Sequence, residues 1–590
     1  MYKFLFFLLI TAVSFGQTNT YQISFENAAH HEATVNATFP NIKSHTLKVE
    51  MSRSSPGRYA VHEFAKNVYN LKATNGKGEE LTTSRPDPYS WEISDHDGTV
   101  NISYTLFANH GDGTYSQVDN THAHLNIPAT FIFSKTLEHR PIEVTIDIPA
   151  NSNWKVATQL KELSATKYAA PDLYYFMDSP MEISDFDLRS FNIDGQDIRF
   201  ALHHPGTKQE FDEYFEKVKK IVKQQKLIFG ELPKYDFGKY TFLACYMPNV
   251  TGDGMEHRNS TILTDVESLA EGGMKGNIGT VSHEYFHSWN VERIRPADLE
   301  PFDFTKANMS GSLWFAEGFT SYYTNLVLTR AKIISAEDYI KSLNGTFNYV
   351  WNSPAHKYFN SIEMSYQAPF VDAATSVDAV NRENTFISYY SYGSILGLAL
   401  DLKLRDNDLN LDNFMKLMWT TYGKSEVAYT IKDIQTTLAK YAGQEFADEF
   451  FSNYIYKSEM PKYADLLKTV GLKLEQLKES AYFGASVKED DNKLIISSNP
   501  KNESPAYKAF LSEGDEIKAA NDSIISSKEA WSELLKSKKS GDKLQLVIVR
   551  NRQEQKTEVT LEEDPAYTIS IDAKADKKAV KMRETWLKSK

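Results

Sequence analysis

The sequence has a single cysteine, Cys245, among its 590 residues. One thiol excludes an internal disulfide and a zinc site built from several cysteines. Because Cys245 lies in the apolar stretch YTFLACYM, we expect it to be a buried, small hydrophobic residue. The chain also lacks an excess of positive charge, since its net charge is −13. This acidic balance argues against a nucleic-acid partner.

Long hydrophobic runs are also lacking. Beyond the N-terminus no run of 18 apolar residues occurs, so we expect no transmembrane segment in the mature chain. The first residues differ, because Lys3 precedes a largely apolar stretch of ten residues. Ser14 and Gly16 then occupy the −3 and −1 positions of a cleavage site before Gln17. This pattern predicts a signal peptide over residues 1–16 and an exported protein, periplasmic in a bacterium and otherwise secreted.

The pattern of hydrophobic residues predicts a multi-domain α+β protein. Residues 17–185 contain runs with a period of two, such as TVNISYTLFA and IEVTIDIP, separated by turn signals. We expect an N-terminal β-sandwich-like domain there. From about residue 205 helical spacing takes over, with one further strand expected around residues 238–246. Residues 186–464 are therefore predicted to form a mostly helical domain.

The C-terminal part has a mixed pattern again. Residues 465–568 resemble a PDZ domain, in which Ser-Pro-Ala opens a short helix and EGDEIKAAN turns into a strand. The resemblance implies that YFGA, residues 482–485, captures a peptide C-terminus on backbone N–H groups. Residues 569–590 remain as a basic tail, for which we expect a charged, partly solvated helix or a frayed end.

The stretch VSHEYFHSWN, residues 281–290, contains the clearest chemical signal. A helix places His283 and His287 on one face, one turn apart, so that both imidazoles can bind one metal. Glu284 lies about 100° round the helix axis, where it can reach a water on that metal. A helix can start near Thr280 and must end before Pro296. The motif therefore predicts a zinc site with Glu284 as the base.

A catalytic zinc takes three protein ligands and keeps one position open. The segment SLWFAEGFTSYYTNLVLTRA, residues 312–331, is apolar almost all round and predicts a buried helix. A carboxylate in such a helix is costly unless it is paired or bound to metal. Glu317 is therefore the predicted third ligand. The alternative is a surface residue that interacts favourably with the helix dipole.

Two further stretches carry weaker signals. In TGDGMEHRNST, residues 251–261, two glycines let the backbone pass close to a ligand, and Glu256 follows them. By itself this stretch is equally well explained as an ordinary turn. In ISYYSYGSILGLALDLKLR, tyrosines precede a long apolar helix that begins at about Ser394, and one hydroxyl could reach a pocket.

Together these stretches resemble the glycyl aminopeptidase family, exported zinc peptidases with a thermolysin-like catalytic domain and a C-terminal PDZ domain, related to the aminopeptidase N group. The matching segments are GMEHRNS, HEYFHSWNVERIRP, LWFAEGFTSYY and YYSYG, and SPGRYAVHEFAKNVYN and DSPMEI in the β domain. The resemblance covers nearly the whole mature chain. It implies one zinc per chain, bound by His283, His287 and Glu317, with Glu284 as general base and proton shuttle.

The same resemblance implies roles for two further residues. Glu256 matches the glutamate that holds the free amine of the substrate in the aminopeptidase N group. Tyr390 matches the tyrosine that donates to the tetrahedral oxyanion. The related enzymes commonly have Tyr-x-Lys-Gly at this point, whereas this chain has Tyr-Ser-Tyr-Gly. Without the lysine, Tyr389 and Tyr392 remain alternatives.

The sequence therefore predicts a zinc aminopeptidase that acts on peptides with a free N-terminus, with small first residues, Gly or Ala, implied by the resemblance. One alternative is a zinc endopeptidase in which Glu256 is structural. Another is a peptide-binding scaffold whose PDZ-like domain does the work and whose metal site is vestigial. The intact His-Glu-x-x-His argues against the scaffold, because a scaffold would not need Glu284.

Overall fold

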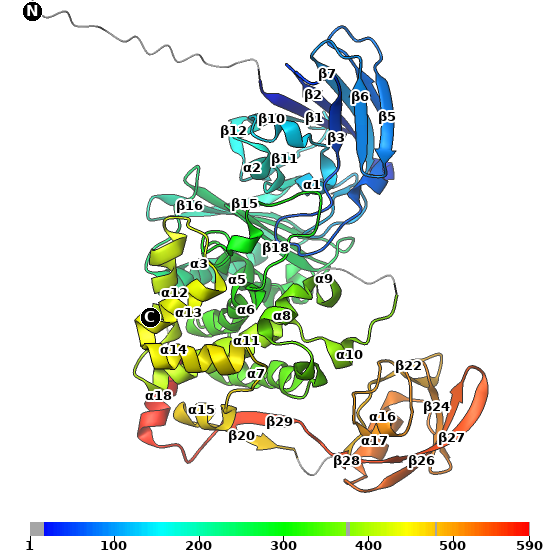
Figure 1. Cartoon of the computed structure of the whole chain (residues 1–590), viewed down its shortest axis with the longest axis vertical. Coiled ribbons are helices and arrows are strands. Elements are labelled where there is room, and N and C mark those ends of the chain that lie inside the picture. Colours follow the sequence, from blue (N-terminus) through cyan, green and yellow to red (C-terminus); the bar gives the residue numbers. More distant parts are fainter. Residues whose placement is uncertain (1–16, 373–377, 478–480, 589–590) are drawn as a thin grey trace, which may run out of the picture. The chain divides into compact units, whose positions relative to one another are not determined.

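The computed structural model describes residues 17–372, 378–477 and 481–588 (Figure 1). The predicted signal peptide, residues 1–16, lies outside these described residues. Across the described ranges, no helix has both the length and the hydrophobicity that a membrane crossing requires. The chain divides into two compact units. The first unit comprises the residues up to Phe215 with Lys234–Asn277 and Phe302–Ala307; the second comprises Glu216–Pro233, Ile278–Pro301 and the residues from Asn308 onward.

The N-terminal β domain is the first part of the first unit. Its largest sheet has seven strands in the order β12-β13-β10-β1-β2-β7-β4. These strands are β1 (Asn19–Asn27), β2 (Glu32–Phe39), β4 (Val68–Thr74), β7 (Val100–Phe107), β10 (Ile142–Asp147), β12 (Lys161–Ser164) and β13 (Lys167–Ala170). The smaller sheets contain β11 (Lys155–Thr158), β14 (Met181–Ser184), β9 (His122–Leu125) and β8 (Gln117–Val118), and β3 (Leu47–Glu50), β6 (Ser90–Ser94) and β5 (Thr82–Asp87).

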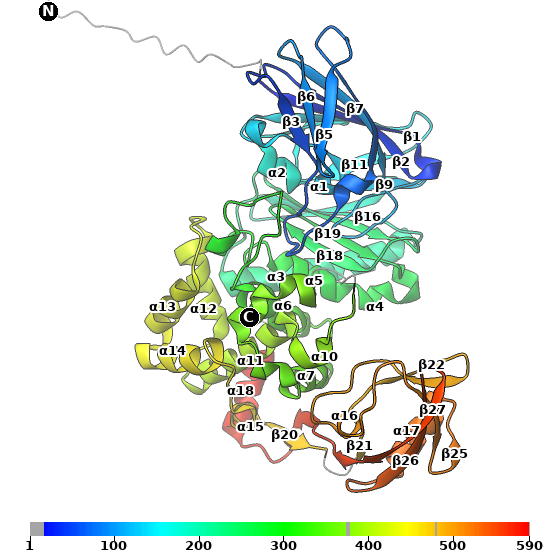
Figure 2. The same ribbon diagram turned by 45° about the vertical axis from the view of Figure 1, so that its right-hand side comes forward.

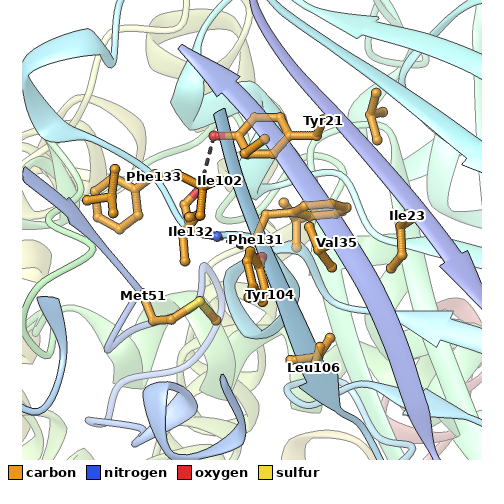
Figure 3. Close-up of a cluster of buried hydrophobic side chains, with 14 of the residues drawn as sticks. Tyr21, Ile23, Val35, Met51, Ile102, Tyr104, Leu106, Phe131, Ile132 and Phe133 are labelled. Carbon is orange, nitrogen blue, oxygen red and sulfur yellow. Dashed lines mark hydrogen bonds between the residues drawn. The ribbon is translucent and has the colours of Figure 1, made fainter. Parts of the chain in front are cut away.

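Alternating burial along the strands accounts for the core of this domain. In β7 every second residue is buried, because successive side chains of a strand point to opposite faces of the sheet. Figure 3 shows part of the resulting core around Tyr21, Tyr104 and Phe131. The Tyr21 hydroxyl donates to the Ile132 carbonyl at 2.9 Å, and the Tyr104 hydroxyl donates to the Thr130 carbonyl at 2.7 Å. Both buried phenols are therefore hydrogen-bonded, as burial requires.

The remainder of the first unit contains a five-stranded sheet, where the sequence predicted one strand. Its order is β15-β16-β17-β19-β18, with β15 (Asp187–Ile193), β16 (Gln196–His203), β17 (Lys239–Tyr246), β18 (Asp253–His257) and β19 (Ser260–Asp265). β16, β17 and β19 run parallel, and β18 returns antiparallel at the edge. The stretch 251–261 is thus a β-hairpin rather than an ordinary turn. The predicted strand is β17. β19 was not predicted, because a strand that is buried along almost its whole length lacks the alternation that marks a half-buried strand.

Helices dominate the second unit, as predicted. They include α5 (Ile278–Phe286), α6 (Leu313–Arg330), α7 (Ala336–Trp351), α8 (Ser361–Tyr366), α11 (Tyr389–Asp406), α12 (Leu411–Met418), α13 (Ile431–Ala442), α14 (Gln444–Phe450) and α15 (Tyr463–Thr469). The predicted helix FDEYFEKVKKIVKQQ is part of α3 (Lys208–Phe229). α6 is buried on nearly every side. It packs against both α5 and α11, which are labelled beside it in Figure 2. This packing brings α5 and α11, which are distant in sequence, together on α6.

α5 is shorter than the sequence predicted. It ends at Phe286, so that His287 lies in the turn that follows rather than inside a continuous helix. The backbone then leaves the helical region, and Val291 has a φ of 124°. The chain continues for one tighter turn, because the His287 N–H donates to the carbonyl of Glu284, three residues before it, at 3.2 Å. His287 therefore still lies one turn beyond His283, and their rings are 4.8 Å apart between centroids.

The predicted PDZ domain forms a six-stranded sheet with the path β22-β23-β24-β26-β27 and β25 paired with β24. Its elements are β22 (Val487–Asp490), β23 (Lys493–Ile496), α16 (Pro505–Lys508), β24 (Glu516–Ala520), β25 (Ser523–Ile524), α17 (Lys528–Lys536), β26 (Lys543–Arg550) and β27 (Gln553–Thr560). Its own core includes Phe483 against Trp531, with ring centroids 4.9 Å apart. Before and after the domain, β20 (Leu472–Gln476) pairs with β29 (Tyr567–Ile571), and β21 (Ala481–Tyr482) with β28 (Glu562–Glu563). The predicted multi-domain α+β architecture is confirmed.

The basic tail forms helix α18 (Lys577–Leu587). One of its residues, Trp586, is fully buried. The Trp586 indole N–H donates to the Tyr322 hydroxyl at 3.0 Å, and the Arg330 guanidinium donates to the Trp586 carbonyl at 3.0 Å. The charged tail therefore contains one buried aromatic residue, Trp586, which is hydrogen-bonded to α6.

Candidate metal centre and active site

The predicted metal ligands meet between α5 and α6 in the second unit. The Oε2 of Glu317 is 3.2 Å from the Nε2 of His287 and 3.5 Å from the Nε2 of His283. One ligand atom from each of the three residues lies within 4.8 Å of the others. Two nitrogen or oxygen ligands of a tetrahedral zinc are about 3.4 Å apart. The donor set and its spacing therefore fit one zinc ion.

Hydrogen bonds orient both imidazoles. The Nδ1–H of His287 donates to the Asn290 carbonyl at 2.7 Å. The Nδ1 of His283 is 3.2 Å from the Thr324 hydroxyl oxygen, and that hydroxyl donates to the Thr320 carbonyl. Since the hydroxyl proton is already engaged, the hydroxyl oxygen accepts from the Nδ1–H of His283. Each Nε2 is thereby left with its lone pair toward Glu317, which is the tautomer that a metal requires.

Asn290, in the turn that follows α5, forms hydrogen bonds to the backbone of α6. Its side-chain amide donates to the carbonyls of Phe315 at 3.1 Å and Ala316 at 2.9 Å, just before Glu317. The same residue thus accepts from His287 through its backbone and holds α6 through its side chain. The sequence analysis assigned no role to Asn290 or Thr324. For Asn290 the available signal is a polar residue one turn after His287, whereas Thr324 lies two turns after Glu317 and has no such signal.

Burial and charge act together on the metal-ligand candidates. Glu317 is 2% exposed, which alone would raise the pKa of its carboxyl group. The facing imidazoles of His287 and His283 outweigh that effect and hold the pKa of Glu317 below its usual range. Burial also lowers the pKa of His283, against the opposing influence of Glu317. A metal that displaces the imidazole protons would therefore meet a carboxylate that is already ionised.

Glu284 follows His283 on α5 and is buried, with 6% of its surface exposed. It is separated from the metal-binding face by the rotation of one residue along the helix. A carboxylate beside the metal position, rather than on it, can accept a proton without occupying a ligand position.

The three tyrosines at the start of α11 lie in different surroundings. The Tyr390 ring is half-buried, 5.9 Å from the His283 ring between centroids. The Tyr389 ring is buried and stacks on Tyr390 at 4.6 Å. The Tyr392 ring is fully buried and packs edge-on against His356 at 5.1 Å. Tyr390 is therefore the one of the three whose ring both contacts a metal-ligand candidate and retains exposed surface.

Two glycines explain why α11 comes so close to α6. A Cβ added at Gly393 would lie 1.9 Å from the Trp314 carbonyl oxygen and 2.7 Å from the Cα of Gly318. The helix backbones therefore touch at this crossing, with no room for a side chain on either helix. Because Gly318 follows Glu317, and Tyr390 lies one turn before Gly393, the crossing sets the separation of these two candidate site residues.

Glu256 lies on β18 in the first unit, whereas the other predicted site residues belong to the second. Its side chain is 5% exposed. A Cβ at Gly57, whose φ is 79°, would lie 2.9 Å from the Oε2 of Glu256, so the SPGR segment passes directly over this carboxylate. Arg58 binds Asp253 at the start of the same strand. His257, which follows Glu256, is 2.9 Å from Asp178 and is held within the unit.

Comparison with protein families identifies three segments. The N-terminal domain of peptidase M61 matches residues 20–185, the M61 glycyl aminopeptidase matches residues 276–396, and a PDZ domain matches residues 481–561. The second segment contains every candidate residue of the metal centre and Tyr390. No curated protein matches the chain by sequence.

A solved structure shares the fold of nearly the whole chain. An aminopeptidase N family protein from Idiomarina loihiensis has a TM-score of 0.86 at 24% identity, over 97% of this chain and 100% of that one. An M1 zinc metallopeptidase from Deinococcus radiodurans, bound to a Tyr-Ser-Ala substrate, has a TM-score of 0.44 at 12% identity, over 76% of this chain and 95% of that one. Yeast LTA4 hydrolase has a TM-score of 0.42 at 15% identity, over 76% and 68%.

Proposed function

This chain is a metallopeptidase of the M61 glycyl aminopeptidase family, and we propose that it is a zinc aminopeptidase that removes small N-terminal residues, glycine or alanine, from peptides. The observation that supports the metal is the convergence of His283, His287 and Glu317, with both imidazoles oriented by hydrogen bonds. The preference for small residues rests on the family alone. One zinc per chain is proposed, held by these three residues.

Zinc at this position would supply Lewis acidity, lowering the pKa of a water toward about 7 and polarising the peptide carbonyl. Glu284 takes the proton from the attacking water and delivers it to the leaving amine. The Tyr390 hydroxyl donates a hydrogen bond to the oxyanion of the tetrahedral intermediate, a contribution of about 3–4 kcal/mol for a typical donor. Tyr390 is assigned this role rather than Tyr389 or Tyr392 because its ring faces His283 and is not enclosed.

The class of peptidase depends on Glu256. We propose that the Glu256 carboxylate binds the α-ammonium group of the substrate. A charge-assisted hydrogen bond from that cation to a carboxylate is worth about 1.5–3 kcal/mol. The surroundings of Glu256 support this role, since the SPGR segment lies against the carboxylate and the pairing of β18 with β19 holds the backbone. A carboxylate positioned in this way binds a compact cation with less loss of entropy than a free one.

Glu256→Ala tests the assignment with matched free and N-acetylated peptides. We expect kcat/KM on free peptides to fall roughly 10- to 150-fold, the equivalent of one charge-assisted bond. N-acetylated peptides should be poor substrates for both proteins, so the variant should discriminate less. Glu267→Ala removes an exposed carboxylate just beyond β19 and should leave both rates unchanged. Unchanged discrimination in a stable Glu256→Ala variant would favour an endopeptidase instead.

The PDZ domain supports a second binding activity. We propose that it takes extended peptide C-termini by strand addition, with the YFGA loop of residues 482–485 receiving the carboxylate. β22 is an edge strand of the domain and has α17 beside it, which leaves one strand edge for a peptide.

We also propose that the protein is exported, with cleavage before Gln17. N-terminal sequencing of the mature protein tests this proposal.

A further inference from the structure

A second cluster of metal-binding side chains lies in the first unit, outside the residues of the proposed mechanism. Cys245 is on β17, His203 ends β16 and His122 begins β9. One ligand atom from each lies within 4.8 Å of the others. β16 and β17 are parallel, and His203 pairs with Cys245 in their register, so the two side chains emerge side by side. The rings of His122 and His203 are 5.0 Å apart.

A carboxylate lies beside the cluster, within ion-pair distance of His203. Glu182 on β14 is fully buried, and its Oε2 is 3.1 Å from the Nδ1 of His124. Its Oε1 points toward His203, 3.6 Å from the Nδ1, and has no hydrogen-bond partner among the described residues. A buried carboxylate oxygen without a hydrogen bond is costly. His203 is within ion-pair distance of this oxygen but too far away to donate a hydrogen bond to it.

We propose that Cys245, His203, His122 and Glu182 form a second zinc site, with a structural role. The Sγ of Cys245 is 3.7 Å from the Nδ1 of His203, and that nitrogen is 3.6 Å from the Oε1 of Glu182. In a tetrahedral zinc site the sulfur–nitrogen separation is about 3.6 Å and the nitrogen–oxygen separation about 3.4 Å. Both separations are already within a few tenths of an ångström of these values, without a metal to draw them together.

The chemistry of the four groups is that of a closed structural site. One thiolate and one carboxylate neutralise a divalent cation, and two neutral imidazoles complete the tetrahedron. Burial raises the pKa of the Cys245 thiol well above its usual range, so the thiol is protonated without a metal. Zinc binding releases that proton to solvent as the thiolate forms its bond to the metal.

Surrounding groups can hold the ligands in place. The Nδ1 of His122 is 2.9 Å from the Thr121 hydroxyl oxygen and 3.4 Å from the Oδ1 of Asp119. An imidazole bonded on one side to a carboxylate and on the other to a metal is a common arrangement in zinc proteins. The Nε2 of His122 is 3.1 Å from the Oε1 of Gln117, and metal binding would replace that contact.

An ion-pair network is the competing explanation. It accounts for His122 beside Asp119 and for His124 beside Glu182. It also pairs the Oε1 of Glu182 with His203, but at 3.6 Å, which leaves that oxygen without a hydrogen bond, and it gives no reason for a thiol at the same point. The metal explains both, since each contributes one bond to it.

Cobalt(II) substitution separates this site from the catalytic one. Cys245 is the only cysteine, so a thiolate-to-cobalt charge-transfer band in the near ultraviolet reports this site alone. We expect the cobalt-loaded full-length protein to bind two metal ions per chain and to show the band. Cys245→Ser should lose the band and one equivalent of metal. Glu317→Gln should weaken metal binding at the other centre and keep the band.

The unsubstituted protein decides the question even if a variant fails to fold. A cobalt-loaded, folded protein that lacks the thiolate band would overturn the proposal, whatever its total metal content. Glu182→Gln should weaken cobalt binding at this site, because it removes an anionic ligand. The affinity is measured by chelator competition, with the thiolate band as the readout. His139→Ala, which removes a histidine whose side chain is 93% exposed, is the control and should leave the band unchanged.

Discussion

Replacing Gly393 by alanine tests the closest helix contact in the candidate active site. The added Cβ would lie 1.9 Å from the Trp314 carbonyl oxygen, about 1.5 Å short of an ordinary van der Waals contact. The obstacle is the backbone of α6, which cannot rotate away as a side chain would. The two helices must therefore separate, and with them Tyr390 and Glu317.

Two opposing effects determine the size of the change in stability. Alanine favours a helix over glycine by about 0.5–1 kcal/mol. Overpacking in a rigid core costs about 1–3 kcal/mol, and a clash with backbone belongs at the upper end. We expect Gly393→Ala to lower the free energy of unfolding by about 2 kcal/mol. A displacement of about 1 Å between reacting groups can reduce turnover about 100-fold, so we expect a loss of that order in kcat/KM.

The assay combines chemical unfolding with kcat/KM measured on zinc-replete protein. Gly345→Ala is the matched control, because Gly345 lies within α7 and has no atom within 4 Å of its added Cβ. That control should gain about 0.5–1 kcal/mol and keep its activity. If Gly393→Ala behaves like Gly345→Ala, α6 and α11 do not touch as described, and the placement of Tyr390 beside His283 loses its support.

Three further substitutions test other parts of the molecule. Glu317→Gln should reduce zinc affinity, measured by chelator competition, because it removes an anionic ligand; full affinity would exclude Glu317 as the third ligand. Glu284→Gln should retain zinc and lose most turnover, since only the base is removed, and near-normal kcat in zinc-replete protein would refute the assigned mechanism. Trp586→Ala should lower the free energy of unfolding by about 3–5 kcal/mol, because it empties a fully buried position and breaks the bond to Tyr322. A loss below about 1 kcal/mol would mean that α18 contributes little to the fold.

Local periodicity explains how much of the centre could be predicted from the sequence. The spacing of His283 and His287 determines their common face wherever the backbone turns helically, and this holds although α5 ends at Phe286. Glu317 could be singled out because an ionisable residue in an apolar helix must have a partner. The domain order followed from the change in hydrophobic period along the chain. Each of these inferences depends on properties of neighbouring residues only.

Long-range packing decided the rest. The three tyrosines of α11 are chemically alike in sequence, and only the crossing of α6 with α11 gives Tyr390 a place beside His283. Periodicity did not reveal β19, because a buried parallel strand does not alternate.

The second metal-binding cluster shows the same limit most clearly. Cys245 was predicted to be a buried hydrophobic residue, and it is buried. Its neighbours His122, Glu182 and His203 come from three other strands and have no characteristic spacing in the sequence. Strand register and sheet packing bring them together, and these depend on contacts between residues far apart in the chain. The local pattern of a sequence determines which face of an element a side chain occupies, whereas tertiary structure determines which side chains meet it there.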